Sequence, residues 1–164
     1  MSKAVLISIQ PKWCNLIANG KKTIEVRKSR PKLETPFKVY IYCTIGNPKN
    51  PHELLEIHYP NGKICKANGK VIGEFICDTF VTDRTFGHDP LFNGAACMSE
   101  IDASAYSCQS SIYGWHISDL KIYDKPKELS EFKGLRKTKF GYEPIKIKKP
   151  PQSWCYVEEC DENA

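Results

Sequence analysis

Three charged side chains near the start of the chain are close enough in sequence to act together. Lys22, Glu25 and Arg27 follow Gly20 in the order Gly-x-Lys-x-x-Glu-x-Arg. A guanidinium binds phosphate or a base edge in a forked geometry, and a carboxylate accepts a hydrogen bond from the amino group of a base. A lysine whose pKa is lowered can act as a base or a nucleophile. The pattern therefore indicates a polar binding site or a small active site.

The segments on either side of Gly20 predict how these side chains are positioned. Residues 11–19 form a short helix by apolar spacing, and Pro11 is tolerated in its first turn. Gly20 is placed to end that helix in a left-handed conformation. Residues 23–28 alternate polar and apolar side chains and predict a strand. A lysine-rich turn between helix and strand would thus place charge at the rim of a cleft.

The parity of the strand decides whether the three groups meet. Glu25 and Arg27 are two residues apart, so they share one face of the strand and can pair with each other. Lys22 lies on the opposite face if the strand already includes it. The amine, the acid and the guanidinium therefore converge only if Lys22 still belongs to the turn.

Each of these groups has a plainer role beside its functional one. The plainer role of Lys22 is that of an exposed turn lysine that contacts phosphate or solvent. Contact with phosphate or another ligand is the first interpretation, and catalysis, which requires desolvation or a neighbouring cation, is the second. Glu25 and Arg27 form a structural ion pair, or they bind the ligand directly. Trp13 and Tyr113 are candidate platforms for a stacked base, worth ~1–3 kcal/mol for each base. Trp115 is assigned to the core.

Composition restricts the class of protein. The chain has 164 residues, a formal net charge of +5 and eight cysteines. The cysteines show no Cys-x-x-Cys spacing and no histidine near enough to complete a metal site, so no metal or cofactor is expected. No segment resembles a signal peptide or a membrane span, which favours a cytoplasmic protein with reduced thiols and no membrane partner. The mild basicity permits a polyanionic partner.

The remaining segments predict an α+β fold with a small β-barrel or a strongly bent sheet, flanked by two or more short helices. A single domain over residues 1–160 is expected, with a β-hairpin insertion around residues 52–68 that turns at Asn61-Gly62. Residues 81–94 are expected to be irregular, residues 95–107 helical, and residues 133–149 a basic loop. Strands are expected at residues 4–9, 37–44, 54–59, 63–66, 70–80, 111–123 and 154–158, and a short helical piece at residues 128–132.

The motif and its context resemble the ASCH domain family, a branch of the PUA-like superfamily. Gly20-x-Lys22-x-x-Glu25-x-Arg27 is similar to the family signature, and a Pro-x-Trp helix precedes it. Residues 69–75 resemble the central strand of the family, residues 113–129 its later strand and proline turn, and residues 150–157 its closing strand. The resemblance implies a PUA-like barrel with a cleft beside the motif and an association with RNA or modified nucleotides.

The resemblance also implies a second function. Some similar members are hydrolases that deacylate N4-acetylcytidine or cut RNA, and the lysine that is catalytic in the deacylating members corresponds to Lys22. The threonine that is their second catalytic residue is replaced here by Glu25. Their third, a glutamate from another segment, has Glu74 and Glu100 as candidates in this chain.

The sequence therefore predicts a domain that binds RNA, a nucleotide or a modified nucleoside in a cleft formed by Lys22, Glu25 and Arg27. Basic side chains between residues 133 and 149 would add affinity that is independent of sequence. The first alternative is a small hydrolase, an amidohydrolase or a ribonuclease, in which Lys22 is catalytic. The second is a protein-interaction module that uses the hairpin at residues 54–66.

Overall fold

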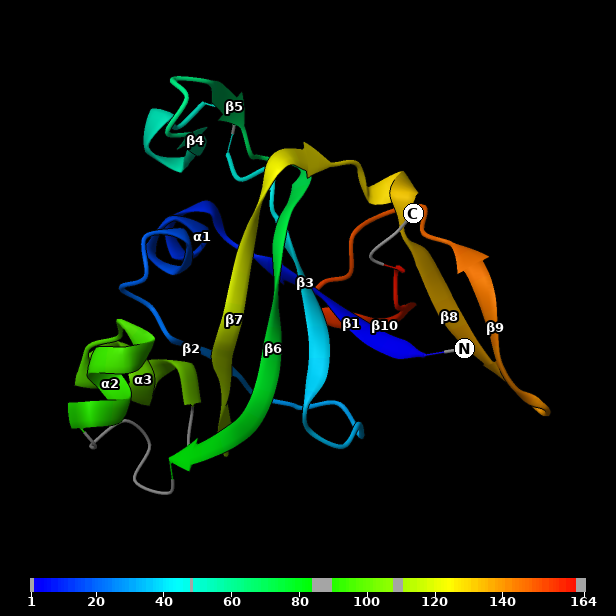
Figure 1. The fold of residues 1–164 in the computed structure, drawn as a ribbon. Helices are drawn as coiled ribbons and strands as arrows, with labels where there is room; N and C mark the ends of the chain where they lie inside the picture. Colours follow the sequence, from blue (N-terminus) through cyan, green and yellow to red (C-terminus); the bar gives the residue numbers. More distant parts are fainter. Residues whose placement is uncertain (1, 48, 84–89, 108–110, 162–164) are drawn as a thin grey trace.

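The computed structural model describes residues 2–47, 49–83, 90–107 and 111–161. Its centre is an eight-stranded sheet in the order β2-β7-β6-β3-β1-β10-β8-β9, with a separate two-stranded sheet formed by β4 and β5 (Figure 1). The fold is thus α+β, as predicted. The strands are β1 (Lys3–Ile9), β2 (Ile24–Arg27), β3 (Phe37–Cys43), β4 (Glu56–His58), β5 (Ile64–Lys66), β6 (Lys70–Asp83), β7 (Ile112–Lys127), β8 (Lys133–Thr138), β9 (Gly141–Lys146) and β10 (Trp154–Glu158).

The middle of the sheet carries the main core. β1 pairs in parallel with β3 and antiparallel with β10, and every residue from Ala4 to Ile9 is buried. A strand buried on both faces is expected to be continuously apolar, and this one departs from that pattern only at Ser8. The largest buried cluster includes Val5, Ile7 and Trp115, so Trp115 lies in the core as expected.

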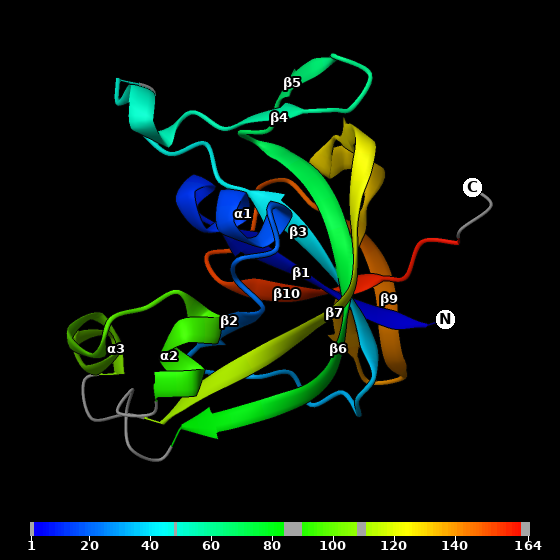
Figure 2. The same ribbon diagram turned by 60° about the vertical axis from the view of Figure 1, so that its left-hand side comes forward.

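The two longest strands, β6 and β7, bend strongly across the sheet (Figures 1 and 2). Their register shifts at three places, the first between Val71 and Gly73. A Cβ atom added at Gly73 would lie 2.4 Å from the carbonyl oxygen of Lys121. The glycine is therefore required by the close approach of the two backbones, which agrees with the bulge or close approach expected at this position.

The predicted closure of the sheet into a barrel is not confirmed. The hydrogen-bonded order runs from β2 at one end to β9 at the other, and no pairing within the described ranges joins these two strands. β2 has only four residues. The β8–β9 hairpin is attached to β10 through one residue pair, Val157 with Gly134, and it extends away from the sheet (Figure 1). The terminal strands therefore diverge instead of meeting.

In the described part of the chain, three α-helices and two short 3₁₀ helices accompany the strands. In Figure 2, α1 lies beside β1 and β3, whereas α2 and α3 lie together near β2. The helices are α1 (Pro11–Ala18), α2 (Pro90–Ala96) and α3 (Glu100–Ser107), and the 3₁₀ helices are η1 (Pro51–Glu53) and η2 (Leu129–Glu131).

The segment between β6 and β7 differs from its prediction. Residues 81–94 were expected to be irregular, but β6 continues to Asp83 and α2 begins at Pro90. Residues 84–89 lie outside the described residues. The single helix expected at residues 95–107 is two helices, and Cys97 between them has a φ of 55°. Proline suits the first turn of a helix, and Phe92 is buried against β2, which explains why α2 forms despite its glycine.

Residues 133–149 also differ from their prediction. Instead of a basic loop, β8 and β9 form a hairpin with six paired positions, from Lys133 with Lys146 to Thr138 with Gly141. Charged side chains are common on exposed edge strands, where they prevent pairing with other chains. The strands were not predicted because a lysine-rich segment is also typical of a solvent-exposed loop.

The hairpin predicted near Asn61-Gly62 is present as β4 and β5, while its status as an insertion stays a prediction. The seven cysteines whose placement is described are all free thiols. Within the described ranges, no helix has the length and apolar character needed to cross a bilayer.

Candidate functional site

The turn between α1 and β2 fixes the position of the motif. The backbone N–H of Gly20 donates to the carbonyl of Ile17, and Gly20 has a φ of 81°, the left-handed conformation predicted for it. The backbone N–H of Lys22 then donates to the carbonyl of Leu16 at 2.9 Å. β2 begins only at Ile24. Lys22 therefore belongs to the turn, and the parity of the strand does not separate it from Glu25.

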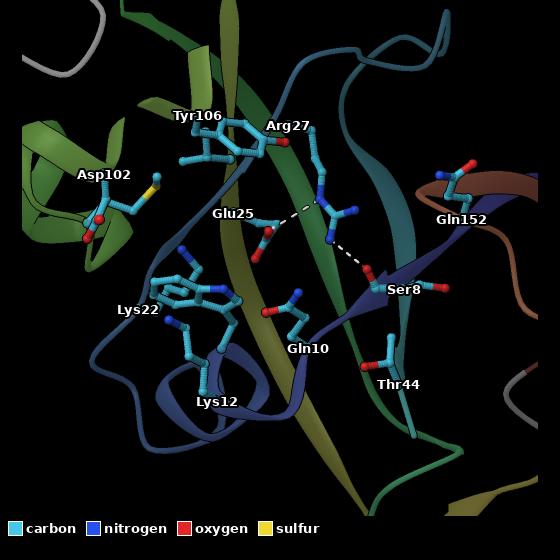
Figure 3. A pocket seen from close by; sticks show the side chains of 13 residues that line it. Ser8, Gln10, Lys12, Lys22, Glu25, Arg27, Thr44, Asp102, Tyr106 and Gln152 are labelled. Atoms are coloured by element: carbon cyan, nitrogen blue, oxygen red, sulfur yellow. Dashed lines mark hydrogen bonds and ion pairs between the residues drawn. The ribbon is translucent and has the colours of Figure 1, made fainter. Parts of the chain in front are cut away.

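The three motif side chains line one cavity of about 560 Å³, which we call the motif cavity (Figure 3). Its walls come from β1, α1, the motif turn, β2, α3 and the segment before β10. The lining residues are Ser8, Gln10, Lys12, Trp13, Lys22, Glu25, Val26, Arg27, Thr44, Met98, Asp102, Tyr106 and Gln152.

Lys22 is a buried cation. Its residue is 3% exposed, and its Nζ donates to the carbonyl oxygen of Ala96 and lies 4.8 Å from the centre of the Trp13 ring. Burial lowers the pKa of Lys22 from its ordinary value of 10.5, and the negative charge of Glu25 partly opposes this effect. An ammonium group has three donors, so two remain after the bond to Ala96.

Glu25 and Arg27 form the ion pair that their spacing predicts. Arg27 Nε lies 3.3 Å from Glu25 Oε1, and both side chains are largely buried. The guanidinium also donates to the carbonyl of Ser8 at 2.6 Å and to Oγ of Ser153 at 3.1 Å. Arg27 thus joins β2 to β1 and to the segment before β10.

The second oxygen of Glu25 is different. Oε2 is buried, and it has no hydrogen-bond donor among the residues that the structure describes. A buried carboxylate oxygen without a donor is unfavourable by about 1–3 kcal/mol or more. It is therefore the acceptor that a bound ligand would satisfy.

The two aromatic candidates are placed differently. Trp13 is half-buried in α1 and lines the motif cavity, where Lys22 and Lys12 lie near its ring. Tyr113 pairs with Arg27 across β2 and β7, but its side chain packs against the main core and is not part of the cavity lining.

Glu74, one of the two candidate third carboxylates, does not line this cavity. Glu74 lies on β6 and lines a separate cavity of about 290 Å³, the Glu74 cavity. There its Oε2 accepts a hydrogen bond from Tyr123 at 2.8 Å, and its Oε1 is 3.6 Å from Lys38 Nζ. Glu100 is the first residue of α3, and its side chain lies outside the part that the structure describes.

Several lining residues were not identified from the sequence. Asp102 and Tyr106 are four residues apart on α3, so they share a face of that helix. Gln10, Thr44 and Gln152 come from three segments distant from one another in sequence. The helical spacing of Asp102 and Tyr106 was a usable signal, whereas the other three are brought to the cavity only by tertiary folding.

Among the described residues, no group of three or more histidine, cysteine, aspartate or glutamate side chains is arranged to hold a metal ion. The polar groups of the motif cavity are two amines and a guanidinium, which donate hydrogen bonds, two carboxyl groups, and hydroxyl and amide groups around them. This set is suited to hydrogen bonding with an organic ligand that carries both donors and acceptors.

The fold is a small α+β domain, and it contains a cavity lined by charged side chains. The ASCH domain profile matches residues 7–151, so the chain belongs to the ASCH domain family, which is associated with RNA binding. The crystal structure of ASCH from Zymomonas mobilis is similar, with 19% identity, a TM-score of 0.58, and 95% of this chain and 88% of that chain covered.

A crystal structure of a tyrosine-to-phenylalanine mutant of the Zymomonas mobilis protein has a TM-score of 0.57 at 19% identity, covering 96% of this chain and 92% of that chain. At this level of identity the likeness shows the fold alone. No curated protein matches the chain.

Proposed function

We propose that the motif cavity binds one nucleoside unit, either a modified nucleoside or nucleotide or one residue of an RNA chain. The observation that carries this proposal is that Oε2 of Glu25 is buried and has no donor among the described residues, in a cavity that is also lined by Lys22. The volume of about 560 Å³ lies within the range of about 300–1,000 Å³ usual for small-molecule sites.

The polar groups are complementary to the edge of a base such as cytosine. Glu25 Oε2 accepts a hydrogen bond from an exocyclic amino group, which is how a carboxylate recognises cytosine. Lys22 donates to a carbonyl oxygen of the base or to a phosphate with its two remaining N–H groups. Trp13 supplies an aromatic surface at the same cavity, where a stacked base gains ~1–3 kcal/mol.

Calorimetric titration with cytidine and N4-acetylcytidine tests the proposal. We expect saturable binding by the wild type and a loss of at least about tenfold in affinity for Lys22→Ala, which corresponds to ~1.4 kcal/mol. Lys38→Ala is the matched control, because Lys38 is a largely buried lysine beside a carboxylate in the other cavity. Equal affinities in the two variants, or no binding by the wild type, would contradict the proposal.

The second candidate is a small amidohydrolase at the same cavity, and the lowered pKa of Lys22 favours it. The neutral amine of Lys22 removes a proton from water, and the hydroxide attacks the acyl carbon of an N4-acylated cytidine. The bond to the base nitrogen then breaks, the nitrogen takes the proton, and a carboxylic acid and a free amino group are the products. Glu25 carries the proton between the two groups, and backbone amides stabilise the oxyanion.

Turnover separates the two candidates. If the chain is a hydrolase, acetate is released from N4-acetylcytidine by the wild type and not by Lys22→Ala. Lys22→Arg, which keeps the charge but cannot become neutral, also loses turnover and keeps part of the binding. Binding by the wild type without acetate release, and without cleavage of an RNA oligomer, would eliminate the hydrolase and leave the binding domain.

A further inference from the structure

A second hollow lies beside the motif cavity, between the β8–β9 hairpin and the segment that leads into β10. Its volume is about 590 Å³, and we call it the basic groove. It is lined by residues 134–136, 145–152, 155 and 156.

The groove combines a positive rim with an apolar floor. Its lining contains four basic side chains, those of Arg136, Lys146, Lys148 and Lys149, and no acidic side chain. Arg136 is paired with Glu143 across the hairpin. The three lysines are exposed and have no ion-pair partner within the described part of the chain. Ile145, Ile147, Pro150, Pro151, Cys155 and Tyr156 supply the apolar surface.

The charge of the whole chain is concentrated in this region. Residues 133–150 contain seven basic side chains and one acidic side chain, whereas the chain as a whole has a formal net charge of +5. The rest of the chain therefore has a net charge of −1. A single-sign patch of this kind attracts a polyanion and determines where on the molecule the polyanion binds.

The groove and the motif cavity share a wall. Gln152 lines both hollows. The segment around it is held in place from the cavity side, because Ser8 Oγ donates to the carbonyl of Pro151 at 2.7 Å and Arg27 Nη1 donates to Ser153 Oγ at 3.1 Å. A chain that leaves the cavity across Gln152 therefore enters the groove beside Lys148 and Lys149.

We infer that the basic groove binds the single-stranded nucleic acid that continues from a nucleotide held in the motif cavity. The substrate of this site is then a polynucleotide and not a free nucleoside. The strand is single, because a base paired in a duplex cannot enter the cavity. Lysines contact successive phosphates, and the apolar and aromatic floor contacts sugars and bases, the combination used for binding single strands. This inference rests on the proposed function and adds the polymeric class of its ligand.

A length series tests the inference. Cytidine monophosphate and cytidine-containing RNA and DNA oligomers of two to eight nucleotides are titrated over a range of salt concentrations. We expect affinity to rise at least tenfold from monomer to oligomer. Each phosphate contact on a single strand contributes a slope of about −0.7 in log K against log salt, so three lysines give about −2.

The variant Lys148→Ala/Lys149→Ala isolates the groove, because both residues lie outside the strands. It is expected to reduce the oligomer slope by about 1.4 and to leave monophosphate affinity unchanged. The control Lys63→Ala/Lys66→Ala removes the same charge from the distant β4–β5 hairpin and is expected to change neither. Binding of either RNA or DNA oligomers with this dependence supports the inference and identifies the sugar preferred.

Three results would overturn it. Monophosphate bound as tightly as every oligomer would show that the groove is not used, while the proposed function stands. Equal weakening of oligomers by both double variants would show that only net charge matters. Polyglutamate that binds as well as the oligomers, with the same dependence on Lys148 and Lys149, would assign the groove to an acidic protein. Failure of the proposed function is separate, since it appears as an absence of any effect of Lys22→Ala.

Discussion

The motif cavity and the Glu74 cavity each contain a largely buried glutamate beside a basic side chain. Only in the Glu74 cavity do both carboxylate oxygens have a partner among the described residues. Glu74 receives a hydrogen bond from Tyr123 on one oxygen and faces Lys38 with the other. Glu25 pairs with Arg27 through one oxygen, while its other oxygen is buried and receives no hydrogen bond from the part of the chain that the structure describes. Similar residue types therefore serve different purposes.

The difference shows how to distinguish a polar network that only stabilises the fold from one that can bind a ligand. A network whose polar groups are all satisfied gains little from a ligand and rigidifies the fold. A network that keeps a buried acceptor free retains an unfavourable group that a ligand can relieve. This criterion assigns the Glu74 cavity a structural role and supports the proposal that the motif cavity binds a ligand.

The largest expected effect is on stability at the motif cavity. Arg27→Ala leaves the buried Glu25 carboxylate without its hydrogen-bonded partner and removes the links to Ser8 and Ser153. Removing one partner of a buried pair costs about 3–5 kcal/mol in the free energy of unfolding. Urea denaturation measures the loss, and Arg27→Lys, which keeps the charge, is expected to lose less. A loss below about 1 kcal/mol for Arg27→Ala would mean that the pair has no structural role.

The second prediction concerns the hydrogen bond between Tyr123 and Glu74 in the Glu74 cavity. Tyr123→Phe removes the donor to Glu74 and is expected to cost about 1.5–3 kcal/mol, because the lost hydrogen bond is to a charged group. Nucleoside binding is expected to stay unchanged. Tyr142→Phe is the control, since the hydroxyl of Tyr142 has no hydrogen bond within the described residues. Weaker nucleoside binding by Tyr123→Phe would show that the two cavities are coupled.

A third change compares the two carboxylates directly. Glu25→Gln replaces the free acceptor by an amide and is expected to weaken nucleoside binding about tenfold, or ~1.4 kcal/mol. Glu74→Gln is expected to leave binding unchanged, because Glu74 lies in the other cavity. Calorimetry on both variants measures the difference. If Glu74→Gln weakened nucleoside binding as much as Glu25→Gln, the proposed difference between the two cavities would be contradicted.

The smallest effect concerns pH. The pKa of Lys22 is lower in the folded chain than its ordinary value of 10.5, so between the two values the unfolded chain binds more protons. Stability therefore rises with pH in that interval because of Lys22. Lys22→Met lacks this contribution, and all other groups are common to both proteins. The wild type is thus expected to gain stability relative to Lys22→Met as pH rises towards 10.5, as measured by urea denaturation. A constant difference would contradict the lowered pKa.

Local signals account for what the sequence predicted well. Pro11 suits the first turn of α1, Gly20 adopts the left-handed conformation after it, and the alternation that follows forms β2. These features depend on neighbours along the chain. The sequence showed that Lys22 must lie in the turn for the three groups to meet. It did not show whether Lys22 does so, because this depends on where β2 begins.

Long-range packing accounts for what the sequence did not predict. α2 contains Asn93 and Gly94, which resemble a loop, yet Phe92 and Ala96 are buried in a cluster with Ile24. The wall that Gln152 contributes to the motif cavity depends on the pairing of β10 with β1. The closure of the sheet into a barrel is not confirmed, and strand lengths and turns do not reveal that the β8–β9 hairpin diverges.

The partner of Lys22 is a backbone carbonyl, that of Ala96, at the end of α2. Every amino acid carries such an oxygen, so the identity of residue 96 says nothing about this contact. What matters is the helical spacing between Phe92, which is buried in a cluster with Ile24, and residue 96, because this spacing sets where the oxygen lies. Inserting or deleting one residue inside α2 would disturb the amine more than most replacements of its side chains, and engineering of this pocket should preserve the length of that helix.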